Sequence, residues 1–423
     1  MAKTRLASLE IPVETAVLVV INEDEADDQV VEEELEGLCE AAGVEPLTII
    51  RQRLDRPYKG TFIGTGKVEE IAVLAKDLKA DVVLIDGEVS GMQQRNLEEA
   101  FQTRVVDRTQ LILDIFARRA RTKEGMLQVE LAQLTYMMPK LMSVYTKFER
   151  QKGGIGMRGP GETKLETDKR MVRDKISKLK GDIEEVKRVR DQQRTSRRKH
   201  PFPFASIVGY TSAGKSTLMN KMAGTDLLAD AMPFATLDPT TRKIDLTDGY
   251  ALFLTDTVGF IRNLPTHLVA AFQSTLEEVT FSDFVIHLVD VSAPSWEVQR
   301  DAVMDTLKIL GAEDKPMITV FNKIDAVDDP TLLRDLVSQF PNSVSISAKS
   351  GEGMPDLQNA IRKQIQDLLG SIKALVPYSE SGLVQECYNF GRVLKEEYRE
   401  DGIYIEAELV NEMKRILEKY VIE

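Results

Sequence analysis

Residues 209–216 of this 423-residue chain are Gly209-Tyr210-Thr211-Ser212-Ala213-Gly214-Lys215-Ser216. They follow an apolar run at 204–208 and match the pattern G-x-x-x-x-G-K-[ST] between a strand and a helix. The two glycines let the backbone approach phosphate oxygens, and the amides that open the next helix supply positive potential. We expect Lys215 to contact the β- and γ-phosphates of a nucleotide, and the Ser216 hydroxyl to bind Mg²⁺. Thr217 completes this predicted nucleotide-binding set.

Three further motifs follow in the order that a guanine-nucleotide site requires: Asp256-Thr257-Val258-Gly259, Asn322-Lys323-Ile324-Asp325 and Ser347-Ala348-Lys349. Asp256 can hold a magnesium-bound water, and the Gly259 amide can contact the γ-phosphate. Asp325 can accept N1–H and N2–H₂ of guanine, a donor pair that adenine lacks. Each motif alone could be a surface turn, but the ordered set predicts GTP and GDP as ligands. We predict a GTP-hydrolysing enzyme with Lys215, Asp256 and Gly259 as its catalytic residues.

The segment before Asp256 contains the expected first switch, Phe234-Ala235-Thr236-Leu237-Asp238, which we assign to the GTP-binding set. Thr236 is the predicted Mg²⁺ ligand beside Ser216, and Thr240 and Thr241 are alternatives by spacing alone. After Gly259, where many such enzymes place a water-orienting glutamine, this chain has Phe260. An apolar side chain cannot orient water, so we predict slow intrinsic hydrolysis that a partner accelerates. Alternatively, a nearby threonine positions the water unaided.

Hydrophobic periodicity predicts an α/β protein of several domains. Residues 1–120 form an expected α/β domain with a parallel sheet, including strands at 16–21 and 81–85 and a helix at 30–42. Residues 201–370 alternate strands and helices, as in a doubly wound P-loop GTPase domain. The strands expected there are 204–208, 243–246, 252–255, 284–289, 317–321 and 344–346.

Two other domains are expected. Residues 121–200 carry two apolar stripes that predict an antiparallel coiled-coil helical arm. A glycine-rich stretch at 153–161 would form its tip, and Thr163 with Glu166 predicts the cap of the second helix. Residues 371–423 predict a small C-terminal α+β domain with a hairpin around Asp401-Gly402 and a closing helix at 411–420.

Charge is distributed unevenly along the chain. The net charge is −13, yet residues 140–199 contain 19 Lys and Arg against 9 Asp and Glu, which gives +10 there and −23 elsewhere. Such a basic segment can face phosphate groups. Only two cysteines occur, Cys39 and Cys387, a count typical of a reducing cytosol. Since no apolar run is long enough to span a membrane, we expect a cytoplasmic monomer without a membrane span.

Outside the nucleotide motifs, the chain resembles the HflX family of the Obg–HflX superfamily. The resemblance rests on residues 107–116 (DRTQLILDIF), 127–134 (LQVELAQL) and 153–163 (GGIGMRGPGET). The switch residues 234–238 and Phe260 also match, and the resemblance covers essentially the whole chain. It implies a GTPase that binds the large ribosomal subunit and splits intact ribosomes in the GTP state, particularly under heat or antibiotic stress.

The resemblance also implies that the arm reaches ribosomal RNA near the peptidyl-transferase centre. This agrees with the basic segment, from which we select as RNA-contact candidates Lys152, Arg158, Arg170, Arg194, Arg197, Arg198 and Lys199. Each could instead be a solvated charge on a helix. The protein is expected to associate with ribosomes, or peripherally with membranes.

Two alternative functions stay open. A GTP-dependent assembly factor for the large subunit would need the same arm and the same chemistry. An ATP-dependent RNA-remodelling protein would instead use the N-terminal domain, where some family members are associated with ATP binding. The glycine-rich stretch at 60–67 is the candidate for that second site, although Thr61 stands where a P-loop needs its first glycine.

Overall fold

The computed structural model describes the backbone of residues 13–22, 28–54, 56–150, 160–197, 202–224, 232–234, 236–246, 250–262, 265, 268, 273–327, 329–389, 391–409 and 411–422. The side chains of 141–150, 160–165 and 191–197 are among those not described. The chain divides into two compact units. The first unit comprises residues 1–119 and 129–180, and the second comprises residues 120–128 and 181–423.

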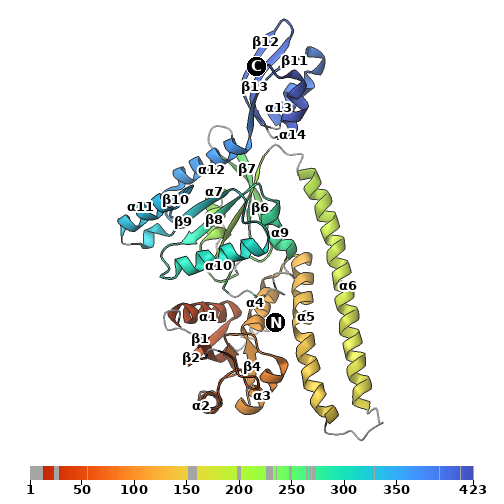
Figure 1. Ribbon diagram of the computed structural model, residues 1–423, viewed down its shortest axis with the longest axis vertical. Helices are drawn as coiled ribbons and strands as arrows, with labels where there is room; N and C mark the ends of the chain where they lie inside the picture. Colours follow the sequence, from red (N-terminus) through yellow and green to blue (C-terminus); the bar gives the residue numbers. More distant parts are fainter. Residues whose placement is uncertain are drawn as a thin grey trace, which may run out of the picture. The chain divides into compact units, whose positions relative to one another are not determined.

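The first unit contains a four-stranded parallel sheet in the order β2-β1-β3-β4 (Figure 1). Its strands are β1 (Glu14–Asn22), β2 (Val44–Arg53), β3 (Val82–Ile85) and β4 (Arg104–Asp107). Helices alternate with the strands: α1 (Asp28–Ala42), α2 (Thr65–Asp77), α3 (Gly91–Phe101) and α4 (Arg108–Arg119). The parallel α/β domain, its two predicted strands and its predicted helix are therefore confirmed.

The two arm helices are α5 (Lys123–Arg150) and α6 (Pro160–Arg197). Within the first unit, Lys175 of α6 pairs with Glu130 of α5 at 2.5 Å. Within the second unit, Arg190 pairs with Glu124 at 2.9 Å, so the chain directions are opposite. The predicted helix cap at Thr163 is wrong, because α6 already begins at Pro160, a residue favoured in the first helical turn. The coiled-coil packing stays a prediction, and the tip residues 151–159 lie outside the described residues.

The second unit is organised around a six-stranded sheet in the order β10-β9-β8-β5-β7-β6 (Figure 1). The strands are β5 (Phe204–Gly209), β6 (Thr240–Asp245), β7 (Ala251–Asp256), β8 (Phe284–Asp290), β9 (Met317–Asn322) and β10 (Ser343–Ser345). β6 runs antiparallel to β7, whereas the other neighbouring pairs are parallel. All six predicted strands are present, with small shifts at their ends.

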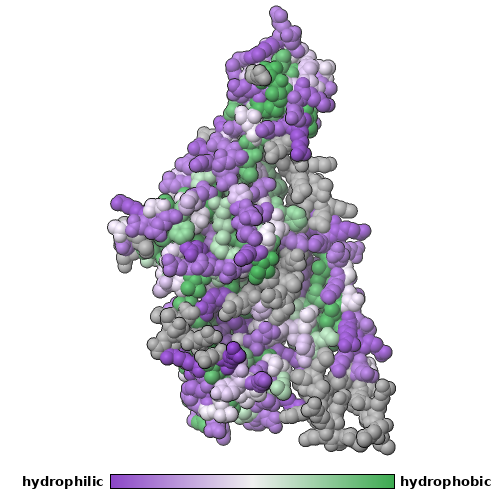
Figure 2. Space-filling model, in the orientation of Figure 1, coloured by the Kyte–Doolittle hydropathy of each residue, from purple (hydrophilic) through white to green (hydrophobic). Residues whose placement is uncertain are grey.

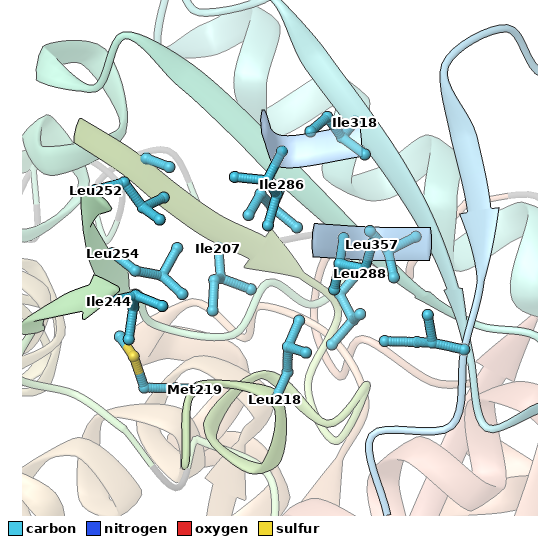
Figure 3. Close-up of a cluster of buried hydrophobic side chains, with 14 of the residues drawn as sticks. Ile207, Leu218, Met219, Ile244, Leu252, Leu254, Ile286, Leu288, Ile318 and Leu357 are labelled. Carbon is cyan, nitrogen blue, oxygen red and sulfur yellow. The ribbon is translucent and has the colours of Figure 1, made fainter. Parts of the chain in front are cut away.

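The core of this sheet explains its continuous apolar strands. Every residue of β8 is buried, as expected for a strand covered on both faces. Figure 3 shows side chains of β5 to β9 gathered against Leu218 and Met219 of α7 (Lys215–Met222) and Leu357 of α12 (Met354–Leu368). On the face shown in Figure 2, the surface over α10 (Trp296–Ile309) and α11 (Pro330–Gln339) is largely hydrophilic, with some apolar side chains exposed on both helices.

A smaller three-stranded antiparallel sheet closes the chain, in the order β11-β13-β12. Its strands are β11 (Gly370–Val376), β12 (Gly391–Arg399) and β13 (Gly402–Leu409), packed with α13 (Gly382–Asn389) and α14 (Asn411–Leu417). The predicted hairpin and closing helix are confirmed. Among the described residues, no helix is both long enough and apolar enough to cross a membrane.

Candidate functional site

Three oxygen-bearing side chains from separate elements meet beside the loop 209–216. Ser216 lies in the first turn of α7, Thr236 precedes β6, and Asp256 ends β7. Ser216 Oγ donates to Asp256 Oδ2 at 2.7 Å, Thr236 Oγ1 donates to the same atom at 3.0 Å, and the two hydroxyls are 3.0 Å apart. Of the threonines considered from spacing, Thr236 is therefore the one that the structure brings to Ser216. Thr241 instead contacts Thr255 at 2.9 Å.

This cluster has the chemistry of a magnesium site. Asp256 is 3% exposed, and its Oδ1 is buried without a hydrogen-bond partner among the described residues. Burial raises the pKa of Asp256, against the opposing effects of Lys215 and the two hydroxyls. A hard cation compensates buried oxygen charge, and Mg²⁺ prefers such ligands while keeping several waters. The chemistry of the three side chains therefore fits Mg²⁺, which Ser216 and Thr236 would bind directly and Asp256 would hold through a water.

Lys215 is held by the backbone of its own loop. Its Nζ donates to the carbonyls of Gly209 at 3.1 Å and Tyr210 at 2.8 Å, and these two hydrogen bonds fix the position of the ammonium group. The residue is 7% exposed. Burial lowers the pKa of Lys215 from 10.5 to about 8, although Asp256 acts in the opposite direction. The loop thus holds a buried amine whose position is set by backbone carbonyls.

We expect the affinity for GDP to fall as the pH rises above about 8, the pKa of Lys215 in the free chain. Phosphate charge favours the protonated amine, so the pKa in the complex is higher. Between the two values, binding takes up a proton and weakens with rising pH. Calorimetry at about pH 9 in two buffers of different ionisation enthalpy measures this uptake. Identical heats would contradict the expectation, and Lys215→Met is the control without uptake.

The opposite end of the site is organised by Asn322, at the end of β9. Its Nδ2 donates to the Ala213 carbonyl at 2.8 Å, and its Oδ1 accepts from the Ala348 amide at 3.0 Å. One buried amide side chain therefore connects the phosphate loop with the predicted base-binding loop. Asp325 is exposed, and a hydrogen bond from the Ser347 side chain is the largest cause that lowers the pKa of its carboxyl. An ionised acceptor is thus available for guanine over the ordinary pH range.

Phe260 is fully incorporated into the fold rather than exposed at the site. It is 1% exposed, its amide donates to the Gly209 carbonyl at 3.1 Å, and its carbonyl accepts from the Thr211 amide at 2.8 Å. A Cβ on the preceding Gly259 would lie 2.9 Å from Thr211 Cγ2 and 3.1 Å from Lys215 Nζ. The backbone of residues 259–260 therefore lies directly against the phosphate loop, and glycine permits this close approach at 259.

Phe260→Ala is expected to reduce the free energy of unfolding by about 3–5 kcal/mol, because it leaves a cavity where a fully buried ring packs. Phe260→Leu, which keeps most of the apolar volume, should cost only about 1.5 kcal/mol. Urea denaturation of both variants measures the difference. Equal and small losses in the two variants would show that the ring contributes little to packing.

The remaining residues assigned from sequence have varied positions. Phe234, Leu237, Thr257 and Val258 are buried, and Thr257 Oγ1 donates to the Ile207 carbonyl at 2.7 Å. Thr217 and Ile324 are half-buried, whereas Ser212 and Lys349 are exposed. Lys323 pairs with Asp290 at 2.6 Å. Ala235 lies outside the described residues.

Asp238 does not face the phosphate loop. Its carboxylate accepts hydrogen bonds from the amides of Arg121 and Thr122 at the start of α5. Sequence reasoning missed this contact because the partners are far apart in the chain. The available signal was Thr122, a preferred residue immediately before a helix.

The RNA-contact candidates are only partly described. Arg170 is exposed on α6. Arg194 and Arg197 belong to the same helix, but their side chains are not described, and Lys152, Arg158, Arg198 and Lys199 lie outside the described residues. In the alternative N-terminal site, Lys67 pairs with Glu70 at 2.7 Å, and the Gly64 amide donates to Gln52 at 3.0 Å.

Comparison with known proteins identifies three family models along the chain. They are described as GTP-binding GTPase N-terminal (residues 30–117), GTP-binding GTPase Middle Region (119–197) and 50S ribosome-binding GTPase (204–323). A solved GTP-binding protein from the archaeon Sulfolobus solfataricus, in complex with GDP, is 24% identical with a TM-score of 0.46. That match covers 83% of this chain and 98% of the other.

Curated relatives match nearly end to end. The GTPase HflX of Lacrimispora saccharolytica is 46% identical over 97% of each chain. That of Escherichia coli is 44% identical over 92% of each chain, and that of Caldanaerobacter subterraneus is 43% identical over 97% of this chain and 94% of its own. With the nucleotide motifs assembled as described, these matches show that the chain belongs to the HflX family of GTPases.

Proposed function

We propose that this GTPase binds the large ribosomal subunit and, with GTP bound, separates the two subunits of the intact ribosome. The observation that carries the proposal is the basic segment 140–199, which lies mainly in α6, a helix of 38 residues within a protein of net negative charge. α6 itself contains 12 Lys and Arg against 8 Asp and Glu, and a helix of net positive charge can follow a phosphate backbone. The family model for residues 204–323, named for 50S ribosome binding, supports the large subunit as its target.

The chemistry of hydrolysis follows from the site residues. Ser216 and Thr236 would hold Mg²⁺, which would neutralise phosphate charge during hydrolysis. Lys215 is fixed by two loop carbonyls and adds a second positive charge. The Gly259 amide would contact the γ-phosphate. Since Phe260 offers no group to orient water, contact with the ribosome accelerates the reaction.

Sedimentation tests the proposal directly. Intact ribosomes are incubated with the full-length protein and GTP, a non-hydrolysable GTP analogue or GDP, and then separated on a density gradient. We expect free subunits with GTP and with the analogue, and intact ribosomes with GDP. Binding to free large subunits without dissociation of intact ribosomes would favour the assembly factor instead. Dissociation that needs ATP and survives Asp325→Ala, but not Lys67→Ala, would favour RNA remodelling through the N-terminal domain.

Arg170 offers a test of the RNA interface. Replacing Arg170 with Glu should weaken large-subunit binding and reduce the steepness of its salt dependence, because one phosphate contact is lost. Lys373→Glu, in the C-terminal sheet, is the control for a charge reversal outside the arm. Equal effects of both variants would indicate general electrostatics rather than contact through α6.

A further inference from the structure

Asp238, the last residue of the first switch, forms hydrogen bonds with the residues that precede α5 in the arm. The Asp238 carboxylate accepts from the Arg121 amide at 3.0 Å, the Thr122 amide at 2.9 Å and Thr122 Oγ1 at 2.5 Å. Residues 120–128 and residue 238 belong to the same compact unit, so the contact lies within one body. Three donors converging on one carboxylate make a specific attachment, since charge-assisted hydrogen bonds are the stronger ones.

The attachment is built into the first turn of α5. Thr122 caps this helix, because its Oγ1 accepts from the Gly125 amide at 3.0 Å and its carbonyl accepts from Met126 at 3.0 Å. A carboxylate beside a helix N-terminus is favoured by the helix dipole. Gly125 allows the close approach: a Cβ at this position would lie 2.5 Å from Asp238 Oδ1. The helix start and the switch carboxylate are therefore fitted to one another.

Thr236, two residues before Asp238, lies in the candidate nucleotide site. Thr236 contacts Ser216 and Asp256, and the intervening Leu237 is 3% exposed. The segment 236–238 is thus anchored at the predicted magnesium site on one side and at α5 on the other. Moving Asp238 away from Thr122 would also disturb the position of Thr236, because only one buried residue separates them.

We propose that Asp238 is a positioning residue for the GTP state, through which the first turn of α5 holds Thr236 in place and favours GTP over GDP. The γ-phosphate and its Mg²⁺ order the first switch, and GDP provides no such contact. Breaking the clamp, defined as Asp238 with Arg121 and Thr122, therefore weakens GTP binding and spares GDP binding. By linkage, GTP tightens the clamp by the same factor.

Gly125→Ala tests the proposal from outside the switch. The added methyl would lie 2.5 Å from Asp238 Oδ1 and 3.2 Å from Thr122 Oγ1, so it displaces the carboxylate from its contact with Thr122. Alanine is a better helix former than glycine, so the later turns of α5 are preserved. The matched control is Gly181→Ala in α6, where a Cβ would meet nothing within 4 Å. Dissociation constants of the full chain for a non-hydrolysable GTP analogue and for GDP, each with Mg²⁺, are measured by fluorescence titration.

For Gly125→Ala we expect the GTP analogue to bind about 5- to 100-fold more weakly, the usual range of coupling between two sites, with GDP binding unchanged. Gly181→Ala should change neither. Asp238→Asn keeps the side-chain volume, should give the same selective loss, and serves as the readout if Gly125→Ala does not fold. Equal weakening of both nucleotides, or no change for the analogue, would overturn the proposal.

Hydrogen exchange gives the reciprocal readout in the unmodified protein. The Arg121 and Thr122 amides, which donate to Asp238, should exchange more slowly with the GTP analogue than with GDP. Identical protection in the two states would make the contact a constant helix cap and refute its role in nucleotide selection. Both measurements use the isolated protein, so they are independent of ribosome binding.

Discussion

Replacing Asp325 with Asn is expected to weaken GTP binding by about 100- to 10,000-fold, because the acceptor loses its charge and the new amide N–H₂ faces the guanine N2–H₂ donor, so that one hydrogen bond is lost and the other is weakened. The same variant should bind xanthosine triphosphate better than the unmodified chain does. Xanthine keeps N1–H as a donor but presents an oxygen at C2, which can accept from the new amide. Nucleotide titrations with GTP and xanthosine triphosphate measure both changes. Asp401→Asn, in the turn between β12 and β13, is the matched control.

The structure makes this a clean test of base recognition. Asp325 lies in an exposed short helix after β9, so its replacement leaves the sheet core intact. The thermal unfolding midpoint should therefore be unchanged. Unaltered GTP affinity in a correctly folded Asp325→Asn protein would remove this residue from the guanine site.

Lys215→Met should lower the rate of GTP hydrolysis by at least about 100- to 1,000-fold, the loss usual for removing one fixed stabilising charge. Methionine preserves most of the apolar stem in a position that is 7% exposed. Removing a buried cation also removes its desolvation cost, so the free energy of unfolding should not fall. Single-turnover hydrolysis at saturating GTP separates the rate from binding.

The control for this variant is Lys221→Met, in the last turn of the same helix and exposed to solvent. It removes the same charge without approaching the phosphates, and it should leave hydrolysis unchanged. A comparable loss in both variants would indicate that overall charge, rather than the placement of Lys215, determines the rate.

Much of the fold could be predicted because strands with continuous apolar sequence are recognisable without their neighbours. β8 and β1 are of this kind. β2 was not predicted: half-buried at the sheet edge, it contains Glu45 and Pro46 early and Arg51 late. β4 contains only two apolar residues, Val105 and Val106, and β11 alternates exposed and buried positions beside β13. For such strands, tertiary pairing rather than local pattern decides the structure.

In the candidate site, too, local motifs could be predicted from the sequence, whereas contacts between distant segments could not. The residues that the motifs single out, such as Ser216 and Asp256, do meet, because parallel strands end at one edge of the sheet. The hydrogen bond between the Asp238 side chain and Thr122 could not be predicted, since the two residues are 116 positions apart in the chain. Likewise, the sequence showed that Phe260 cannot orient water, but not that its backbone pairs with Gly209 and Thr211.

The antiparallel strand β6 limits how far the first switch can travel. β6 begins at Thr240, which lies opposite Asp256 in the pairing with β7. While β6 stays paired with β7, only four residue steps connect Thr236 to Thr240. When fully extended they span about 14 Å. When the first switch opens, Thr236 can therefore move only a short distance from the site. It can return without sampling many conformations. The distance between residues 236 and 240, measured with a pair of spectroscopic probes, should therefore not exceed about 14 Å in any nucleotide state.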